Sequence, residues 1–181
     1  MPKMKYLTLT MLLILLAVMC PGCASNEAGP EQVNETPKAG EITTANETLS
    51  GEALYAYVTE ENNYKNWKLW PGTGELAPGK GPHGDLITIY VSDNALSAIE
   101  GKAGVMPENS TVVKEGHDSN GELKEVVVMH KVAGFDPKHN DWYWAEYDAS
   151  GKVLAEGKEL SCYNCHTRAA SNDYLFTGNL K

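Results

Sequence analysis

Three residues near the end of the chain have the types and the spacing that one covalently bound cofactor requires. Cys162, Cys165 and His166 form the arrangement C-x-x-C-H. Positions three and four apart lie on the same side of a helix, so one helical turn brings both sulfurs and the imidazole together. In this arrangement the two thiols form thioether bonds to the vinyl groups of haem, and the adjacent histidine supplies the proximal iron ligand. The motif predicts one haem c, bound through Cys162 and Cys165 and ligated by His166.

Two other uses of closely spaced cysteines fit less well. A structural zinc site needs two further ligands, and none of the remaining histidines lies at finger-like spacing: His83, His117, His130 and His139. A redox-active C-x-x-C pair normally lies near the start of a βαβ unit. This motif ends 15 residues before the C-terminus, which favours haem.

The other two cysteines lie in a segment typical of export. Residues 1–23 run from two lysines through an apolar stretch to Cys20 and Cys23, which is the pattern of a signal peptide. The apolar run is shorter than the roughly 20 residues that span a bilayer. Gly22 directly before Cys23 resembles the lipobox of exported lipoproteins. We predict a signal peptide over residues 1–22 and a lipidated Cys23 that anchors the protein to the outer face of a membrane.

Two alternatives to this processing stay open. Cys20 is a second candidate for the processing site, and the segment could also remain as an uncleaved signal anchor. Each of them leaves the rest of the chain outside the cytoplasm, where haem is attached covalently. The export signal therefore supports the haem prediction independently.

The chain is acidic, with 15 Lys and Arg residues against 24 Asp and Glu residues and a formal charge of −9. Nucleic-acid binding needs clustered basic side chains, and Arg168 is the only arginine, so we expect no nucleic-acid partner. An acidic surface favours a redox partner with a positive patch. Residues 24–50 hold five Glu, one Lys and no aromatic residue, which predicts a flexible spacer before one haem domain at residues 51–181.

Short runs of β-branched and aromatic residues alternate with turn signals in this domain. The runs predict strands at residues 86–91, 111–115, 125–132 and 141–147. Apolar residues at helical spacing predict helices at residues 51–60, after a Ser50 cap, and at residues 93–100. The expected fold is α+β: an antiparallel β-sheet with a few short helices and a C-terminal c-type haem motif.

The position of the motif narrows the type of cytochrome. A small electron-carrier cytochrome c has its motif near the N-terminus and a methionine ligand downstream, but no Met or His follows His166. The sixth iron position is therefore filled from upstream or left open. After the predicted signal peptide, the upstream methionines are Met106 and Met129, and Met129 lies in an apolar run typical of a core. Helical cytochromes c′ also carry a C-terminal motif, but their four-helix bundle conflicts with the predicted strands.

A series of segments, in order and at similar spacing, resembles the cytochrome P-460 family, which includes the related β-sheet cytochromes c′. The resemblance covers about residues 55–178. It rests on Pro82 to Gly84, Asp85 to Val91, Thr111 to Glu115, Val128 to Lys131, Gly134 with Phe135, Asp141 to Trp144, the haem motif and Asp173 to Thr177. It implies an antiparallel α+β domain, usually dimeric, with a five-coordinate haem c whose open face binds small nitrogen species.

The resemblance also implies two functions and assigns one lysine. In hydroxylamine-oxidising members a lysine is bonded to the porphyrin edge, and Lys114 occupies the matching position. Members without this bond bind gases, and the alternative function is therefore nitric oxide binding or detoxification. Lys114 could instead be a surface lysine that pairs with Glu115 or Glu125, and Lys131 is the second candidate for the bond. Simple electron transfer is a third function, but it needs a sixth protein ligand.

The remaining site residues follow from alternation along one strand. Oxidation of hydroxylamine needs a group that takes protons, and Glu146 is the candidate catalytic base, with Asp148 on the same strand face. Trp142 and Trp144 share that face and are expected in the core or a pocket wall. The sequence leaves open which face meets the haem. His83 is expected in a tight bend or near the haem, and Arg168 beside a haem propionate or in solvent.

Overall fold

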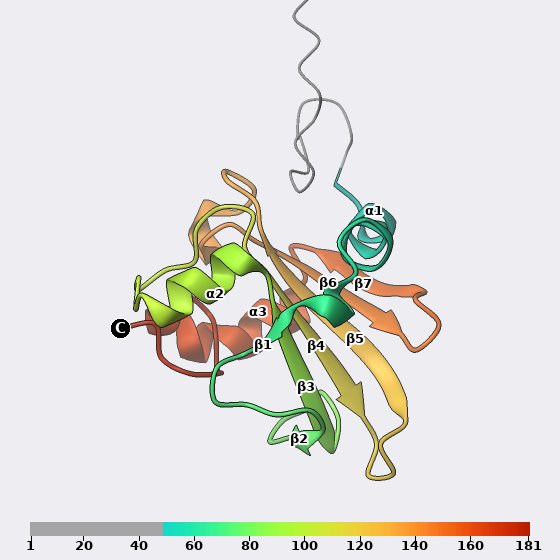
Figure 1. The fold of residues 1–181 in the computed structure, drawn as a ribbon. Coiled ribbons are helices and arrows are strands. Elements are labelled where there is room, and N and C mark those ends of the chain that lie inside the picture. Colours follow the sequence, from blue (N-terminus) through green and yellow to red (C-terminus); the bar gives the residue numbers. More distant parts are fainter. Residues whose placement is uncertain (1–48) are drawn as a thin grey trace, which may run out of the picture. The chain divides into compact units, whose positions relative to one another are not determined.

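Seven antiparallel strands form one sheet in residues 49–181, the part of the chain that the computed structural model describes (Figure 1). The strand order is β1-β3-β4-β5-β6-β7, and β2 pairs with the other end of β3. The strands are β1 (Lys68–Leu69), β2 (Ala77–Pro78), β3 (Leu86–Val91), β4 (Thr111–His117), β5 (Leu123–Lys131), β6 (Trp142–Asp148) and β7 (Val153–Gly157). This architecture confirms the predicted α+β class with an antiparallel sheet.

Several sequence predictions concern the chain before this part. The signal peptide at residues 1–22, the lipidated Cys23, the alternative Cys20 and nearly all of the spacer lie outside the described residues. Within residues 49–181, none of the helices has both the length and the apolar character that crossing a bilayer requires.

The four predicted strands correspond to β3, β4, β5 and β6, with ends that differ by at most two residues. Three strands were not predicted. Both β1 and β2 have only two residues, and β7 is an edge strand whose side chains are exposed or half-buried throughout. Such a strand carries little apolar patterning, because only one of its edges is paired and neither face is fully covered.

Short helices flank the sheet, and the first of them begins at a capping serine. In α1 (Gly51–Ala56) the Ser50 hydroxyl accepts a hydrogen bond from the Ala53 amide at 3.1 Å, which confirms the predicted cap. The helix continues as a π-helical turn, Tyr57–Glu61, so the predicted helix over residues 51–60 is π-helical in its second half. The predicted helix over residues 93–100 is α2 (Asp93–Glu100), and α3 (Leu160–His166) contains the C-x-x-C-H motif.

Each face of the sheet carries its own buried core cluster. One face packs against α1 and the π-helical turn, through a buried cluster that includes Leu54, Val58 and Tyr147. The Tyr147 hydroxyl also donates to the Gly51 carbonyl at 2.8 Å, which fastens α1 to β6. Side chains on this face come from alternate strand positions, as the pleat of a strand requires.

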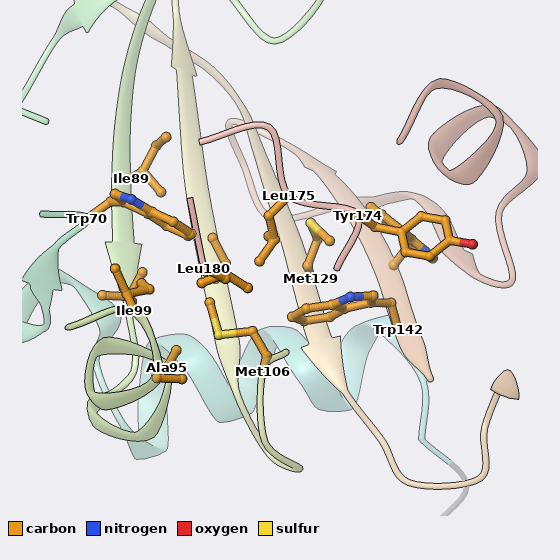
Figure 2. Close-up of a cluster of buried hydrophobic side chains, with 14 residues drawn as sticks. Trp70, Ile89, Ala95, Ile99, Met106, Met129, Trp142, Tyr174, Leu175 and Leu180 are labelled. Atoms are coloured by element: carbon orange, nitrogen blue, oxygen red, sulfur yellow. The ribbon is translucent and has the colours of Figure 1, made fainter. Parts of the chain in front are cut away.

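The opposite face carries the second core cluster together with α2 and the C-terminal segment. Figure 2 shows Leu180 and Ile99 near Trp70, Met106 next to Leu180, and Met129 and Leu175 near Trp142. These side chains are almost fully buried. Both upstream methionines belong to this core, as expected for Met129, whose side chain also borders the cavity described below.

Candidate functional site

A cavity of about 280 Å³ lies between this second face of the sheet and α3. Its floor comes from alternate positions of neighbouring strands, and its other wall comes from α3 and the segment that follows. The side chains that matter for chemistry are Lys114, Glu125, Glu146, Cys162, Cys165 and His166, among apolar neighbours such as Val127, Trp144, Leu175 and Phe176. The three motif residues, Lys114 and Glu146 therefore line one cavity.

A second hollow of about 670 Å³ adjoins the first. The lining residues shared by the two include His83, Lys114, Cys165 and His166, so the two hollows meet beside the C-x-x-C-H motif. The second hollow is bounded on its outer side by the loop around β2, and Arg168 borders it with an exposed side chain. The pairing of Arg168 with a haem propionate stays a prediction.

His166 is held in one orientation by the chain itself. Its Nδ1 lies 2.6 Å from the Tyr174 carbonyl oxygen, and because a carbonyl only accepts, Nδ1 carries the proton and donates. Trp144 and Phe176 contact the ring edge-on, with centroids 4.8 and 5.0 Å away. Burial lowers the pKa of His166, which favours the neutral ring. The lone pair of Nε2 is therefore available to a metal, as in metal-bound histidines whose other nitrogen donates to a carbonyl.

The two cysteines occupy α3 one turn apart. The Glu159 side chain caps the helix by accepting from the Ser161 amide at 3.1 Å. Cys162 is half-buried and Cys165 is exposed, and both are free thiols that line the cavity with His166. Burial raises the pKa of the Cys162 thiol to about 11.

Lys114 lines the cavity from the middle of β4. Its cross-strand neighbours are Ile89 and Val127, so the amine rises from an apolar row. Burial lowers the pKa of Lys114, and the charge of Glu125 opposes this effect. Of the two carboxylates considered as surface partners, Glu115 lies on the other face, where its side chain accepts from the Tyr64 hydroxyl at 2.7 Å and pairs with Lys65.

Glu146 faces the same cavity from β6. It lies opposite Val127, whose other neighbour is Lys114. This register shows which face of β6 meets the cavity. Trp144 and Glu146 border the cavity, whereas Tyr143 and Tyr147 pack in the cluster beneath α1.

Two further residues of that strand that the sequence singled out, Asp148 and Trp142, lie outside the cavity lining. Asp148 ends the strand and accepts from the Ser150 and Lys152 amides in the β6–β7 turn. Trp142 is a core residue, in agreement with the expected role.

Two further titratable residues, His83 and Lys131, have partners that the sequence did not indicate. His83 lines the cavity, which is one of the two positions expected for it. Its Nδ1 lies 3.1 Å from Glu125 Oε1. Glu125, which the sequence suggested only as a partner of Lys114, itself borders the cavity. Lys131, the second candidate for the porphyrin bond, instead forms a buried ion pair with Asp173, with Nζ 2.8 Å from each carboxylate oxygen.

The residues around the cavity fit a bound haem. The walls are largely apolar, the motif residues face inward, and the His166 Nε2 lone pair is free to bind iron. The indole Nε1 of Trp144 is buried and has no hydrogen-bond partner among residues 49–181, which marks a polar contact that a bound group could complete. In the same part of the chain no three His, Cys, Asp or Glu side chains come together as a metal site.

The comparison with protein families gives one match. The model of the family described as Cytochrome P460 matches residues 61–177, well over half of the chain. The chain belongs to the cytochrome P460 family. A comparison with curated proteins gave no match. The matched region of this cytochrome P460 protein includes Lys114, Glu146 and the C-x-x-C-H motif, and membership of the family makes it a c-type haem protein.

Proposed function

We propose that this cytochrome P460 protein oxidises hydroxylamine at one haem c, attached through Cys162 and Cys165 and ligated by His166. The observation that carries the proposal is that Lys114 lines the same cavity as these three motif residues. Hydroxylamine oxidation occurs in the family to which the chain belongs, and the family resemblance assigns the porphyrin bond of the oxidising members to Lys114.

The haem would supply a Lewis-acidic iron that binds the nitrogen of hydroxylamine and accepts its electrons. His166 would ligate the iron through Nε2 while its Nδ1–H donates a hydrogen bond to the Tyr174 carbonyl oxygen. The edge-on contacts with Trp144 and Phe176 restrict rotation of the ring. The proximal ligand is thus preorganised by the chain.

Lys114 would join the porphyrin edge through an Nζ–C bond that replaces one N–H and one C–H bond, and the two electrons and two protons released would reduce one hydrogen peroxide to two waters. The apolar row around Lys114 supports this role, because burial lowers the pKa of the amine and so increases its neutral, nucleophilic fraction. The side chain has no hydrogen-bond or ion-pair partner within residues 49–181 that would compete for it. The bond would alter the electronics of the haem, as the resemblance implies for the oxidising members.

Glu146 would act as the base. Oxidation of hydroxylamine releases protons together with electrons, and a carboxylate at the cavity wall can take the protons. The electrons would pass to a redox partner, and the excess of acidic residues favours one with a positive patch. We further propose that a lipid on Cys23 anchors the protein to the outer face of a membrane, and that the domain can form a homodimer.

Proteolysis of the purified holoprotein followed by mass spectrometry tests this function. We expect the haem to carry the peptide with Cys162 and Cys165 and also the peptide with Lys114. In Lys114→Arg the peptide that contains position 114 should no longer be attached to the haem, and oxidation of hydroxylamine should be lost. Haem attached to the cysteine peptide alone in the wild type would exclude the cross-linked enzyme and favour the nitric-oxide-binding alternative. Absence of haem staining on a denaturing gel would overturn both.

A further inference from the structure

The most completely satisfied buried carboxylate beside the site belongs to Asp173. Its side chain is fully buried and accepts four hydrogen bonds from three donor groups. Lys131 Nζ lies 2.8 Å from both oxygens, the Met106 amide donates at 2.7 Å, and the Asn140 side-chain amide donates at 2.8 Å. These donors come from β5 and from two loops. Asp173 therefore ties three separated parts of the chain to the segment that follows α3.

The backbone at Asp173 is fixed as well. Asp173 and Tyr174 both have positive φ angles, 54° and 65°, which side-chain-bearing residues adopt rarely without support. The Asp173 carbonyl accepts from the Trp142 indole at 2.9 Å, and the Tyr174 amide donates to the Ala169 carbonyl at 2.9 Å. This tight turn directs the next carbonyl, that of Tyr174, at Nδ1 of His166, 2.6 Å away.

We propose that the ion pair of Lys131 and Asp173 is a positioning device for the proximal histidine, holding the Tyr174 carbonyl against His166 Nδ1. The inference rests on the proposed ligation of iron by His166 and adds two residues that lie outside the cavity lining. A short hydrogen bond from Nδ1 raises the basicity of the imidazole and so strengthens its donation to the iron. Stronger donation favours the ferric state and lowers the reduction potential.

The obvious rival is that the ion pair acts through its charge alone. Lys131→Met removes a positive charge, so a purely electrostatic effect lowers the reduction potential of the haem. Asp173→Asn removes a negative charge and, by the same effect, raises it. The positioning role predicts the same direction in both variants, because both loosen the turn and release the Tyr174 carbonyl. The sign of the two shifts therefore separates the explanations.

The test uses the ferrous holoprotein and the ion pair on the opposite face as a matched control. Lys65→Met also leaves a buried carboxylate, Glu115, without its lysine, but on the face that packs against α1. We expect the iron–histidine stretching band in resonance Raman spectra to move to lower frequency in both Lys131→Met and Asp173→Asn. The reduction potential should rise in both. Lys65→Met should change neither quantity.

Two milder variants keep the test decisive if Lys131→Met or Asp173→Asn fails to fold with haem attached. Lys131→Arg should restore the wild-type band and potential, and Asn140→Ala, which removes a single donor, should give a smaller shift in the same direction. An unchanged stretching band in these haem-loaded variants, or opposite shifts of the potential in Lys131→Met and Asp173→Asn, overturns the positioning role. Wild-type protein with haem but without an iron–histidine band would instead refute the proposed ligation.

Discussion

Lys114 and Glu146 are the two cross-strand neighbours of Val127, one from β4 and one from β6. The spacing of neighbouring strands puts their Cα atoms about 10 Å apart on one face of the sheet. No hydrogen bond or ion pair joins the two side chains in the part of the chain that the structure describes. An amine and a carboxylate therefore face one cavity without neutralising each other, and each is free for a separate task.

The first prediction concerns Lys114. We expect Lys114→Met to keep haem staining, because Cys162 and Cys165 remain, but to lose the attached lysine peptide and hydroxylamine oxidation. The fold should tolerate the change, since a neutral side chain replaces an amine whose burial is unfavourable. Lys124→Met changes an exposed lysine near the start of β5 that pairs with Asp118 and Glu122, and this matched control should retain both properties. Full activity in Lys114→Met would contradict the assigned role.

The second prediction concerns Glu146. Replacement by Gln removes the proton acceptor without changing the volume, so kcat for hydroxylamine oxidation should fall by roughly 10²- to 10⁴-fold. Haem attachment and the Lys114 cross-link should persist in the mass spectrum. Asp148→Asn changes a carboxylate on the same strand that serves the β6–β7 turn, and its kcat should match the wild type. Equal rates for the two variants would remove Glu146 from the mechanism.

The third prediction concerns acid stability and His130. This side chain is 1 % exposed on the face that packs against α1, and burial lowers its pKa to about 4. Below pH 6.5 the unfolded chain takes up a proton at His130 that the folded chain does not, so the free energy of unfolding falls as the pH falls toward 4. Between pH 7 and pH 5 this one group should cost about 2 kcal/mol.

Urea unfolding of the wild type and of His130→Asn at pH 7 and pH 5 measures that contribution. The variant should be less stable at pH 7, since a buried ring that lies 2.8 Å from the Thr111 hydroxyl is replaced. Its further loss on going to pH 5 should be smaller than that of the wild type by about 2 kcal/mol. Parallel losses in both proteins would show that His130 does not titrate in this way.

The fourth prediction concerns the bend that carries His83. Gly84 has a φ of +97°, and a Cβ there would lie 2.7 Å from the His117 amide nitrogen and carbonyl oxygen. Gly84→Ala therefore combines a disfavoured backbone conformation with a backbone clash and should lower the free energy of unfolding by roughly 1–3 kcal/mol. Gly81→Ala, in the same loop but with open space around its Cβ, should be close to neutral in urea unfolding. A similar loss in both would contradict the steric argument.

The sequence could predict features that depend on neighbours along the chain. The C-x-x-C-H motif, the Ser50 cap and four strands rest on local spacing, and alternation correctly grouped Glu146 with Trp144. The choice of face could not be predicted, because each face of β6 carries two large aromatic residues that are buried in one of the two core clusters. Two partnerships also escaped prediction, His83 with Glu125 and Lys131 with Asp173, since each joins residues 42 positions apart that only the closed fold brings together.

The placement of Lys114 and Glu115 on opposite faces of β4 makes this strand sensitive to insertions and deletions. Side chains alternate between the two faces of the sheet, so loss of one residue ahead of Lys114 would move every later side chain of β4 to the opposite face. The carboxylate that serves Tyr64 would then enter the cavity, and the reactive amine would be buried among tyrosines. We therefore expect evolution to change the length of this domain in its turns and to leave the length of β4 fixed.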